Sequence, residues 1–343
     1  MSEDVAFLRQ MLEIYSPSRE EGRLAAYLRD RMAALGFRAR VDEVGNPVGE
    51  IGTGEREVVL LGHIDTVEGY IPVRQEGDLL YGRGAVDAKS PMAAFVLAAA
   101  RARPRNLRVV VIGAVEEEGA SSRGARHAVR RPRPDFAIIG EPSGWSGITL
   151  GYKGRFWINY TLERPTRHSA GPGQSPCEEA VAFWNTVSAY AAAYNRERRG
   201  FETLDPSLRR FNSTSDGFSE RVEQLISVRV PPGFAVAEFK DAAVGWAGEA
   251  QCLFANEDAP FRADKSNALV RAFLGAIRAQ GGEPKFKLKT GTADMNVVGP
   301  VWGCPIVAYG PGDSSLDHTP DEHISLAEFR RGVEVLTTVL ESL

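Results

Sequence analysis

The sequence predicts an α/β fold: a mostly parallel sheet flanked by helices, with a smaller α+β sandwich inserted into it. Short apolar, β-branched runs alternate with helical segments over residues 58–139, as in a buried parallel sheet. A strand of alternating apolar and polar residues then follows at 155–163, which is typical of a half-exposed antiparallel sheet. The α/β pattern resumes near Ala263.

The N-terminal part justifies this prediction element by element. Residues 3–36 predict two helices, and Gly36 is placed to close the second. Strands and turns lead to Asp65, and Pro91 then suits the first turn of an alanine-rich helix over 92–103. A strand leading to the glutamate run at 116–118, a helix over 121–131 and a strand over 135–139 complete the alternating pattern.

The remaining elements divide the chain into two domains. The inserted domain, 154–259, is expected to contain these elements: a strand at 155–163, a helix at 176–195, a polar loop, a strand ending at 228–230, a helix from 233 and a strand at 251–255. The discontinuous domain, 1–153 and 260–343, then adds a helix at 266–280, strands at 285–289 and 305–309, and a helix at 325–342.

Bulk properties are those of an ordinary globular protein of 343 residues, with 43% hydrophobic and 25% charged residues. A net charge of −4 gives no general case for nucleic acid or membrane surfaces. The three cysteines form no CxxC pair, which favours reduced thiols. We find no signal-peptide core and no stretch of membrane-spanning length, so we expect a cytoplasmic protein.

Most of the candidate site residues follow the apolar runs. Because the carboxyl ends of parallel strands share one edge of a sheet, these side chains are expected to converge. Histidines and carboxylates without cysteine suit one or two divalent metal ions, so the pattern predicts a metallohydrolase site. The candidates are His63, Asp65, Asp87, Glu116, Glu117, Glu118, Glu141 and His318.

Each candidate has a simpler explanation when taken alone. His63-x-Asp65 is a weak motif, although Asp65 on the same strand face suits the far ring N–H of His63. Asp87 also suits a plain turn, and His318 an exposed loop. Three adjacent glutamates repel one another, so one metal ligand beside one general base is a better explanation. The joint pattern would otherwise require several independent coincidences.

The motifs GHIDTV, GRGAVDAK, EEEG, GEP, RHSAGP and HTPDE, in this order, resemble a known family over essentially the whole chain. It is the co-catalytic zinc metallopeptidase family of acetylornithine deacetylase and succinyl-diaminopimelate desuccinylase, with a zinc-exopeptidase-like fold and a lid/dimerisation domain. The resemblance implies two Zn²⁺ or Co²⁺ ions bridged by Asp87. His63 and Glu141 would complete one ion, and Glu117 and His318 the other.

The same resemblance implies that Glu116 is the general base and that Asp65 orients His63. The family usually has an aspartate where this chain has Val115, so a second alignment shifts the base to Glu117 and the ligand to Glu118. We prefer the first alignment, because it leaves one spacer before Gly119. The segment after Asp87 also lacks the double glycine that is common in relatives.

Further residues match family positions outside the metal site. His168 matches a histidine that stabilises the oxyanion across a homodimer interface. Arg229 and Asn212 match lid residues that grip a substrate carboxylate, and Arg suits this because its fork binds bidentately. Thr290, Gly291 and Thr292 match the donor loop. Asp294 is a candidate partner for a cationic side chain.

Length and the KTGTADMN loop most resemble the branch that releases lysine or ornithine from the C-terminal glutamate of a small acidic amino-group carrier protein. That is the last step of lysine biosynthesis through α-aminoadipate, or of a parallel arginine route. An acidic partner calls for a basic surface, and the candidates for it are Arg123, Arg126, Arg130, Arg131, Arg133, Arg209 and Arg210. The alternatives are an N-acetyl-ornithine or N-acetyl-lysine deacetylase, a dipeptidase, and a non-catalytic metal-binding homologue.

Overall fold

The structure, a computed structural model, describes residues 2–119, 121–168 and 170–343. The chain divides into two compact units, and each is described by itself. The sequence-based boundaries lie within a few residues of this division, except that Lys289–Thr292 falls with the second unit. The first unit comprises Met1–Gly151, Arg262–Leu288 and Ala293–Leu343, and the second comprises Tyr152–Phe261 and Lys289–Thr292.

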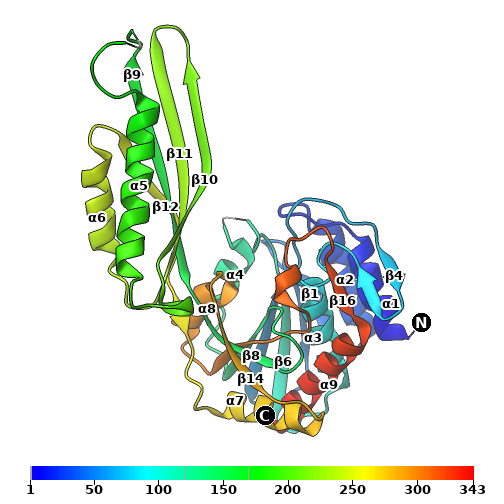
Figure 1. Ribbon diagram of the computed structural model, residues 1–343. Coiled ribbons are helices and arrows are strands. Elements are labelled where there is room, and N and C mark those ends of the chain that lie inside the picture. Colours follow the sequence, from blue (N-terminus) through cyan, green and yellow to red (C-terminus); the bar gives the residue numbers. More distant parts are fainter. Residues whose placement is uncertain (1, 120, 169) are drawn as a thin grey trace. The chain divides into compact units, whose positions relative to one another are not determined.

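A largely parallel sheet forms the centre of the first unit (Figure 1). Within the described residues it has nine strands in the order β1-β2-β6-β3-β7-β15-β8-β13, and β14 pairs with β8. The strands are β1 (Arg38–Val41), β2 (Pro47–Ile51), β3 (Arg56–His63), β6 (Leu107–Ala114), β7 (Phe136–Gly140), β8 (Gly147–Tyr152), β13 (Phe261–Arg262), β14 (Lys285–Lys289) and β15 (Ile306–Ala308).

The middle of this sheet is parallel, because β3 pairs in parallel with both β6 and β7, and β7 pairs in parallel with β15. Strand β2 pairs antiparallel with β6, and β8 with β15. Strand β3 has a continuous apolar run, Val58 to Leu61, and its side chains are fully buried on both faces. The expected α/β fold is confirmed.

Helices cover both faces of the sheet. Helices α1, α3, α7 and α9 pack with one another and contribute to one large apolar core with α2, while α4 and α8 pack against β6 and β15 (Figure 1). A small sheet of order β16-β5-β4 lies beside them. The bounds are α1 (Glu3–Glu13), α2 (Gly22–Ala34), α3 (Lys89–Arg101), α4 (Arg123–Ala128), α7 (Ala268–Ala279), α8 (Asp294–Trp302), α9 (Leu326–Ser342), β4 (Arg74–Glu76), β5 (Leu79–Tyr81) and β16 (His323–Ser325).

The second unit is an antiparallel sheet of order β10-β11-β9-β12 with two helices, α5 and α6. Phe156, Ile158 and Tyr160 on β9 alternate inward into its own core, as the period of two predicts. A capping box between Ser175 and Glu178 starts α5. The bounds are β9 (Gly154–Pro165), α5 (Pro176–Tyr194), β10 (Asp205–Ser215), β11 (Ser219–Val230), α6 (Val236–Ala247) and β12 (Gln251–Asp258).

The sequence-based prediction did not include β8, β10 and α8, nor the short strands β4, β5, β13 and β16. Residues 209–218, which include the end of β10, are all exposed, so no alternation of apolar residues marks this strand. Helix α8 contains Pro300 near its end and closes at Gly303, and both residue types favour a loop in the sequence. None of the helices in the described residues is long and apolar enough to cross a bilayer.

Candidate metal centre

The ends of the parallel strands carry the candidate ligands. His63 is the last residue of β3, and Glu141 directly follows β7. A Cβ added to Gly140 would lie 2.9 Å from the Cα of Gly62 on the neighbouring strand. Glycine at this position therefore permits the close approach of the two strand ends that bear His63 and Glu141.

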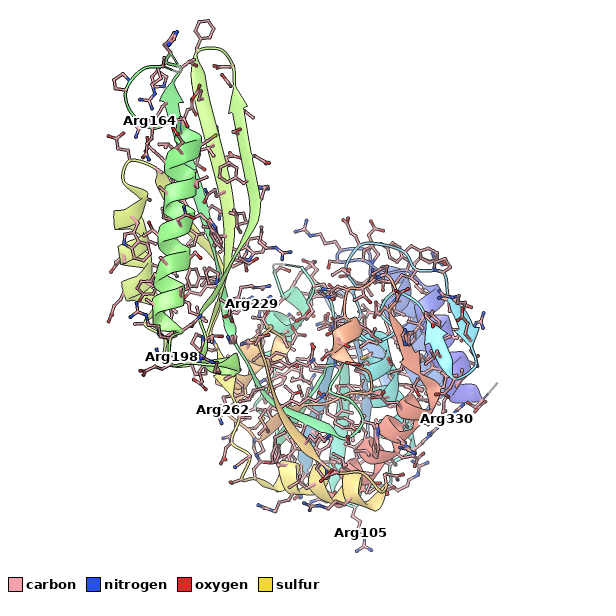
Figure 2. The ribbon with its side chains drawn as sticks, in the orientation of Figure 1. Arg105, Arg164, Arg198, Arg229, Arg262 and Arg330 are labelled. Atoms are coloured by element: carbon pink, nitrogen blue, oxygen red, sulfur yellow. The ribbon has the colours of Figure 1, made fainter. Side chains whose placement is uncertain are left out.

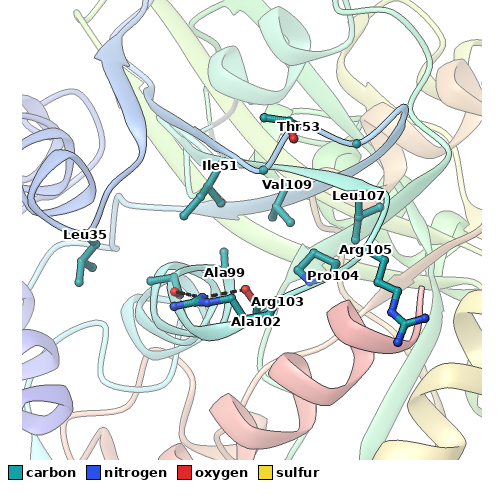
Figure 3. A pocket seen from close by; sticks show the side chains of 13 residues that line it. Leu35, Ile51, Thr53, Ala99, Ala102, Arg103, Pro104, Arg105, Leu107 and Val109 are labelled. Atoms are coloured by element: carbon teal, nitrogen blue, oxygen red, sulfur yellow. Dashed lines mark hydrogen bonds between the residues drawn. The ribbon is translucent and has the colours of Figure 1, made fainter.

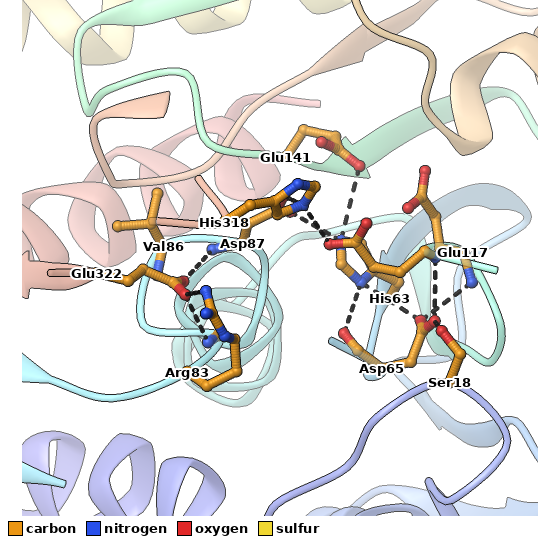
Figure 4. A network of polar contacts seen from close by, with 12 residues as sticks. Ser18, His63, Asp65, Arg83, Val86, Asp87, Glu117, Glu141, His318 and Glu322 are labelled. Atoms are coloured by element: carbon orange, nitrogen blue, oxygen red, sulfur yellow. Dashed lines mark hydrogen bonds and ion pairs between the residues drawn. The ribbon is translucent and has the colours of Figure 1, made fainter. Parts of the chain in front are cut away.

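Asp87 lies between the two histidines (Figure 4). Its Oδ1 is 3.0 Å from Nε2 of His63, and its Oδ2 is 3.2 Å from Nε2 of His318. Glu141 Oε1 lies 4.0 Å from Nε2 of His63 on the side of the first histidine. One carboxylate that turns one oxygen towards each of two imidazoles has the arrangement expected of a bridging ligand.

Glu118 completes the side of the second histidine. Its Oε1 is 2.8 Å from Nε2 of His318. Two overlapping groups have ligand atoms within 4.8 Å of one another: Asp87, Glu118 and His318 in one, and His63, Glu117 and Glu118 in the other. The structure thus brings together six side chains from five segments of the chain.

Glu116 is not part of this cluster. It has a φ of 59°, in the left-handed region, and its carboxylate accepts a 2.7 Å hydrogen bond from Ser121 Oγ and lies 3.4 Å from Arg123 Nη1. The left-handed residue turns the chain, so that Glu117 and Glu118 face the histidines and Glu116 does not. This placement favours the shifted alignment over the alignment preferred from the sequence.

Asp65 holds the glutamate loop. Its Oδ1 accepts the backbone N–H of Glu117 and its Oδ2 that of Glu118, both at 3.0 Å, and Ser18 Oγ donates to Oδ2 at 2.6 Å. For His63, the nearest acceptor of Nδ1 is the carbonyl oxygen of Asp65 at 3.0 Å, while the carboxylate Oδ1 lies at 3.5 Å. Asp65 therefore orients both a histidine and two glutamates.

Ionisation of the buried carboxylates Glu117 and Glu118 is unfavourable. Burial raises the pKa of Glu117 well above its ordinary value, and the neighbouring charges of Glu141, Asp294 and Glu118 add to this. Burial and the charge of Asp87 likewise raise the pKa of Glu118. Such a cluster calls for compensating positive charge.

Protons on the histidines supply that charge when no ion is bound. Hydrogen bonds to Asp87 and Glu118 raise the pKa of His318 to about 10. Burial by itself would lower the pKa of His63, but its contacts with Asp65 and Asp87 raise it well above the ordinary value. Two imidazoles and several carboxylates fit divalent ions such as Zn²⁺ or Co²⁺, which would take the place of these protons.

The residues predicted to bind substrate lie in the second unit. Arg229, on β11 (Figure 2), donates from Nη1 to Oγ1 of Thr292 at 2.8 Å, so the structure brings these two together. Asn212 is exposed on β10, seven residues beyond Asp205, the partner of Arg229, which puts it about 20 Å along the strand. His168 is exposed in the loop before α5, and its Nδ1 accepts from the N–H of Ala170.

Two residues that contact the segments bearing the candidate ligands were not foreseen from the sequence. Ser18 contacts Asp65 from a loop far away in the sequence. Glu322, which is 1% exposed, accepts backbone N–H groups of the loop that carries Asp87. The only sequence signal for Glu322 is its place in the HTPDE motif, because burial of a carboxylate cannot be read from residue type.

Two other features lie apart from this cluster. Asp42, Glu43 and His127 also have metal-ligand atoms within 4.8 Å, but Arg40 and Arg131 line the same cavity and disfavour a cation. A cavity of about 340 Å³ between Ile51 and Leu107 is lined mainly by apolar side chains (Figure 3). No described residue lining it is a histidine, aspartate or glutamate.

A mostly parallel sheet with histidines and carboxylates at its carboxyl edge defines the class of metal-dependent hydrolases. The pattern of peptidase family M20/M25/M40 matches residues 59–342, and the chain belongs to this family. The chain is 47% identical to the "[LysW]-lysine hydrolase" of Deinococcus radiodurans, over 98% of this chain and 96% of the relative. It is 40% identical to the "Putative [LysW]-lysine/[LysW]-ornithine hydrolase" of Pyrococcus abyssi, over 99% and 94%.

Solved structures agree with the fold. An M20 family metallo-carboxypeptidase from Sulfolobus solfataricus matches with a TM-score of 0.81 and 18% identity, over 99% of both chains. A dinuclear metal binding peptidase of the M20 family from Bacillus subtilis matches with a TM-score of 0.69 and 14% identity, over 98% of this chain and 96% of that chain. At these identities the likeness concerns the fold.

Proposed function

We propose that the protein is a metal-dependent amide hydrolase that releases lysine or ornithine from the C-terminal glutamate of a small acidic amino-group carrier protein. This would be the last step of lysine biosynthesis through α-aminoadipate, or of the parallel arginine route. The observation that carries the proposal is the 47% identity, over nearly the full length of both chains, to a relative named for that reaction. The cluster around Asp87 supports the chemistry.

In this proposal the site holds two divalent ions, Zn²⁺ or Co²⁺. One would be held by His63, Asp87 and Glu141, and the other by Asp87, Glu118 and His318. When bound, such ions lower the pKa of water and polarise the scissile carbonyl. The support from the chain's own residues is that the two oxygens of Asp87 face different histidines, at 3.0 and 3.2 Å.

Glu117 is the general base in this scheme. It lies beside His63 and Glu118, and its backbone is fixed by Asp65. A carboxylate there is placed to take a proton from the attacking water and to return it to the leaving amine.

Arg229 and Thr292 are proposed to bind the α-carboxylate of the released amino acid. The guanidinium of Arg229 already uses Nη1 for Thr292 Oγ1, which orients the fork. Gly291 and Thr290 precede Thr292 in the same loop and would add backbone or hydroxyl donors. Asn212 and His168 would act from a second copy of the chain, His168 as the oxyanion donor.

A homodimer would join two such chains through the second unit. Within the described residues, β10 pairs with β11 on one side only, which leaves one edge of the sheet open. Exposed Phe211 on β10 and Val181 on α5 line one shallow cavity beside this edge. A second copy of β10 and α5 would cover both features.

The acidic carrier would dock on basic side chains near the site. Arg123, Arg126 and Arg130 line a cavity of about 340 Å³ next to the glutamate loop. Arg131 and Arg133 have partners inside the first unit, Glu57 and the carbonyl of Gly303. Arg123 and Arg126 also have partners there, Glu116 and the carbonyl of Ser121, so the choice rests on position. Because Arg123, Arg126 and Arg130 all line this cavity, we assign the docking surface to them, with Arg209 and Arg210 on β10 as a second candidate.

The first test is hydrolysis by metal-free protein with and without added Zn²⁺ or Co²⁺. Carrier-bound lysine is compared with carrier-bound ornithine and with N-acetyl-lysine. Metal-dependent release from the carrier supports the proposal, and preference for the acetylated amino acid would make the protein an ordinary deacetylase. Tight metal binding without hydrolysis of any of them would favour a non-catalytic homologue.

The dimer has its own test. His168→Ala and Glu117→Gln are each expected to be inactive, and mixing the two after dissociation should restore activity if His168 acts across the interface. Restoration follows because the mixed dimer has one site with both residues intact. If the mixture stays inactive although mixed dimers form, His168 does not act in the partner's site.

A further inference from the structure

The buried carboxylate of Glu322 holds the loop that carries Asp87 (Figure 4). Its Oε1 accepts the backbone N–H of Val86 at 2.9 Å and that of Asp87 at 3.1 Å. Its Oε2 accepts the N–H of Gly84 at 3.1 Å and Nη1 of Arg83 at 2.9 Å. One side chain, 1% exposed, thus satisfies three backbone donors of one loop and one guanidinium.

This loop is shielded from solvent. Ala85 and Val86 are fully buried, and Ala88, which precedes α3, offers no side-chain cap. Gly84 has a φ of 86°, in the left-handed region that favours glycine. A buried N–H without a partner costs about 1–3 kcal/mol, so the loop keeps this conformation only with an acceptor at the position of Glu322.

Glu322 is also tied to the second histidine. It lies four residues after His318, and its own carbonyl accepts the N–H of Gly82 at 3.2 Å. Arg83 Nη1 reaches the carbonyl of Thr319, next to His318, at 3.3 Å. The segment 318–322 and the segment 82–87 are therefore fastened to each other, and each carries one member of the Asp87, Glu118 and His318 group.

His318 itself has a φ of 63°, in the left-handed region, which an unconstrained histidine rarely adopts. Such a conformation persists where the surrounding structure fixes it. The contacts of Thr319 and Glu322 fix the chain directly after His318. Together they leave little freedom in the separation between Oδ2 of Asp87 and Nε2 of His318.

We propose that Glu322 is a positioning residue for the metal centre: it sets the separation of Asp87 and His318 and so the affinity for the ion that these share with Glu118. The inference rests on the proposed two-metal function. Glu322 touches neither substrate nor ion, and it acts on the Asp87 loop as Asp65 acts on the glutamate loop. The competing explanation is a contribution to folding stability alone.

Glu322→Gln tests the two explanations. Glutamine has nearly the same shape as glutamate, but an NH₂ group replaces one of the two carboxylate oxygens. This donor then faces the N–H groups that the oxygen accepted. We expect one of the two ions to bind about 10–100-fold more weakly, as happens when the partner of a ligand is changed. Metal-free protein is titrated with Co²⁺ by calorimetry, and the visible absorption of the bound Co²⁺ reports the ligand geometry, which is expected to change for the weakened ion only.

Asp216→Asn is the matched control. Asp216 also accepts two loop N–H groups, from Phe218 and Ser219, but its turn lies in the second unit and carries no proposed metal ligand. It should lower the melting temperature and leave both Co²⁺ affinities and the spectrum unchanged. If Glu322→Gln behaves in the same way as Asp216→Asn, Glu322 serves stability alone and the inference is wrong.

Where Glu322→Gln does not fold, Glu322→Asp decides the question. Aspartate retains the charge, but its carboxylate is withdrawn by one methylene. We therefore expect the same ion to bind more weakly and the Co²⁺ spectrum to change, both by less than in Glu322→Gln. Wild-type affinities in this variant would overturn the inference. The proposed function fails separately, if the wild-type protein binds fewer than two Co²⁺ ions or does not hydrolyse the carrier-bound substrate.

Discussion

The carboxylate of Asp65 accepts the backbone N–H of Glu118 over 3.0 Å, so a residue just beyond β3 fixes a proposed ligand in the loop after β6. In Asp65→Asn, an NH₂ group replaces one of the two oxygens that accept the N–H groups of Glu117 and Glu118, so two donors face each other there. We expect metal affinity and kcat/KM to fall by about 10–100-fold. Calorimetry and steady-state kinetics check this, and Ser18→Ala, which removes one donor only, should cost less.

Glu117 and Glu116 make a matched pair of neighbours. Glu117→Gln removes the proposed base, and kcat should fall by about 10²–10⁴-fold while two ions still bind. Glu116→Gln changes a carboxylate that faces Ser121 and Arg123, and kcat should fall by less than about tenfold. A larger loss for Glu116→Gln than for Glu117→Gln would restore the alignment that the sequence favoured.

Metal uptake should release protons. The pKa of His318 is raised to about 10 without an ion, so this imidazole is charged at neutral pH and must lose its proton to bind an ion. Apparent metal affinity should therefore rise with pH. Calorimetric titrations at about pH 7 in two buffers of different ionisation enthalpy should give different heats, and equal heats would contradict the prediction.

The same shift predicts the stability of the metal-free protein. A folded-state pKa above the unfolded value means that protonated His318 stabilises the fold fully below about pH 6.5, the ordinary histidine value. This contribution is lost as the pH rises towards about 10. The melting temperature of metal-free protein should fall over this range, and that of His318→Gln should fall less.

Arg229 should determine affinity for the substrate carboxylate. Arg229→Lys retains the charge but loses the fork that Thr292 orients, so KM should rise by about tenfold or more with a smaller change in kcat. Thr292→Val should have a weaker effect of the same kind. Kinetics with carrier-bound lysine check both, and an unchanged KM for Arg229→Lys would remove it from the carboxylate site.

Charge reversal separates carrier recognition from chemistry. In the double variant Arg123→Glu/Arg130→Glu, kcat/KM for the carrier-bound substrate should fall and become less sensitive to salt, while N-acetyl-lysine turnover stays the same. Arg105→Glu, beside the cavity of Figure 3, is the control with the same type of change elsewhere. Equal losses on both substrates would argue against docking at these arginines.

Residues at strand ends were predictable from the sequence. His63 and Glu141 come after apolar runs, Val58 to Leu61 and Phe136 to Ile139, and buried parallel strands bring the residues at their carboxyl ends to one edge of the sheet. Asp87 and His318, which lie in loops, were also candidates, but each by itself suited a plain turn or an exposed loop, and only the resemblance to relatives gave them ligand roles. A loop ligand has no periodic pattern around it, so its position comes only from contacts made in the folded chain.

The register of the glutamates was not predictable. Whether Glu116 or Glu117 faces the histidines depends on the backbone conformation of Glu116, which has a φ of 59°. Because three identical residues stand in a row, the sequence gives no sign of which one adopts it. The role of Glu322 was not predicted either, because it depends on contacts with a loop that is distant in the chain. Glu322 and Asp87 are 235 residues apart in the sequence. Strand β10 was missed because most of its residues are exposed.

The cluster is assembled from segments that leave the ribosome at widely different times. His63, Asp87, Glu117 and Glu118 precede the second unit in the chain, whereas His318 and Glu322 come after its main segment. A nascent chain that has been synthesised only as far as β12 thus lacks His318, and it lacks Glu322, whose carboxylate accepts the N–H of Asp87. Ion capture would then be a late event of biosynthesis, and it would select chains whose synthesis has passed His318.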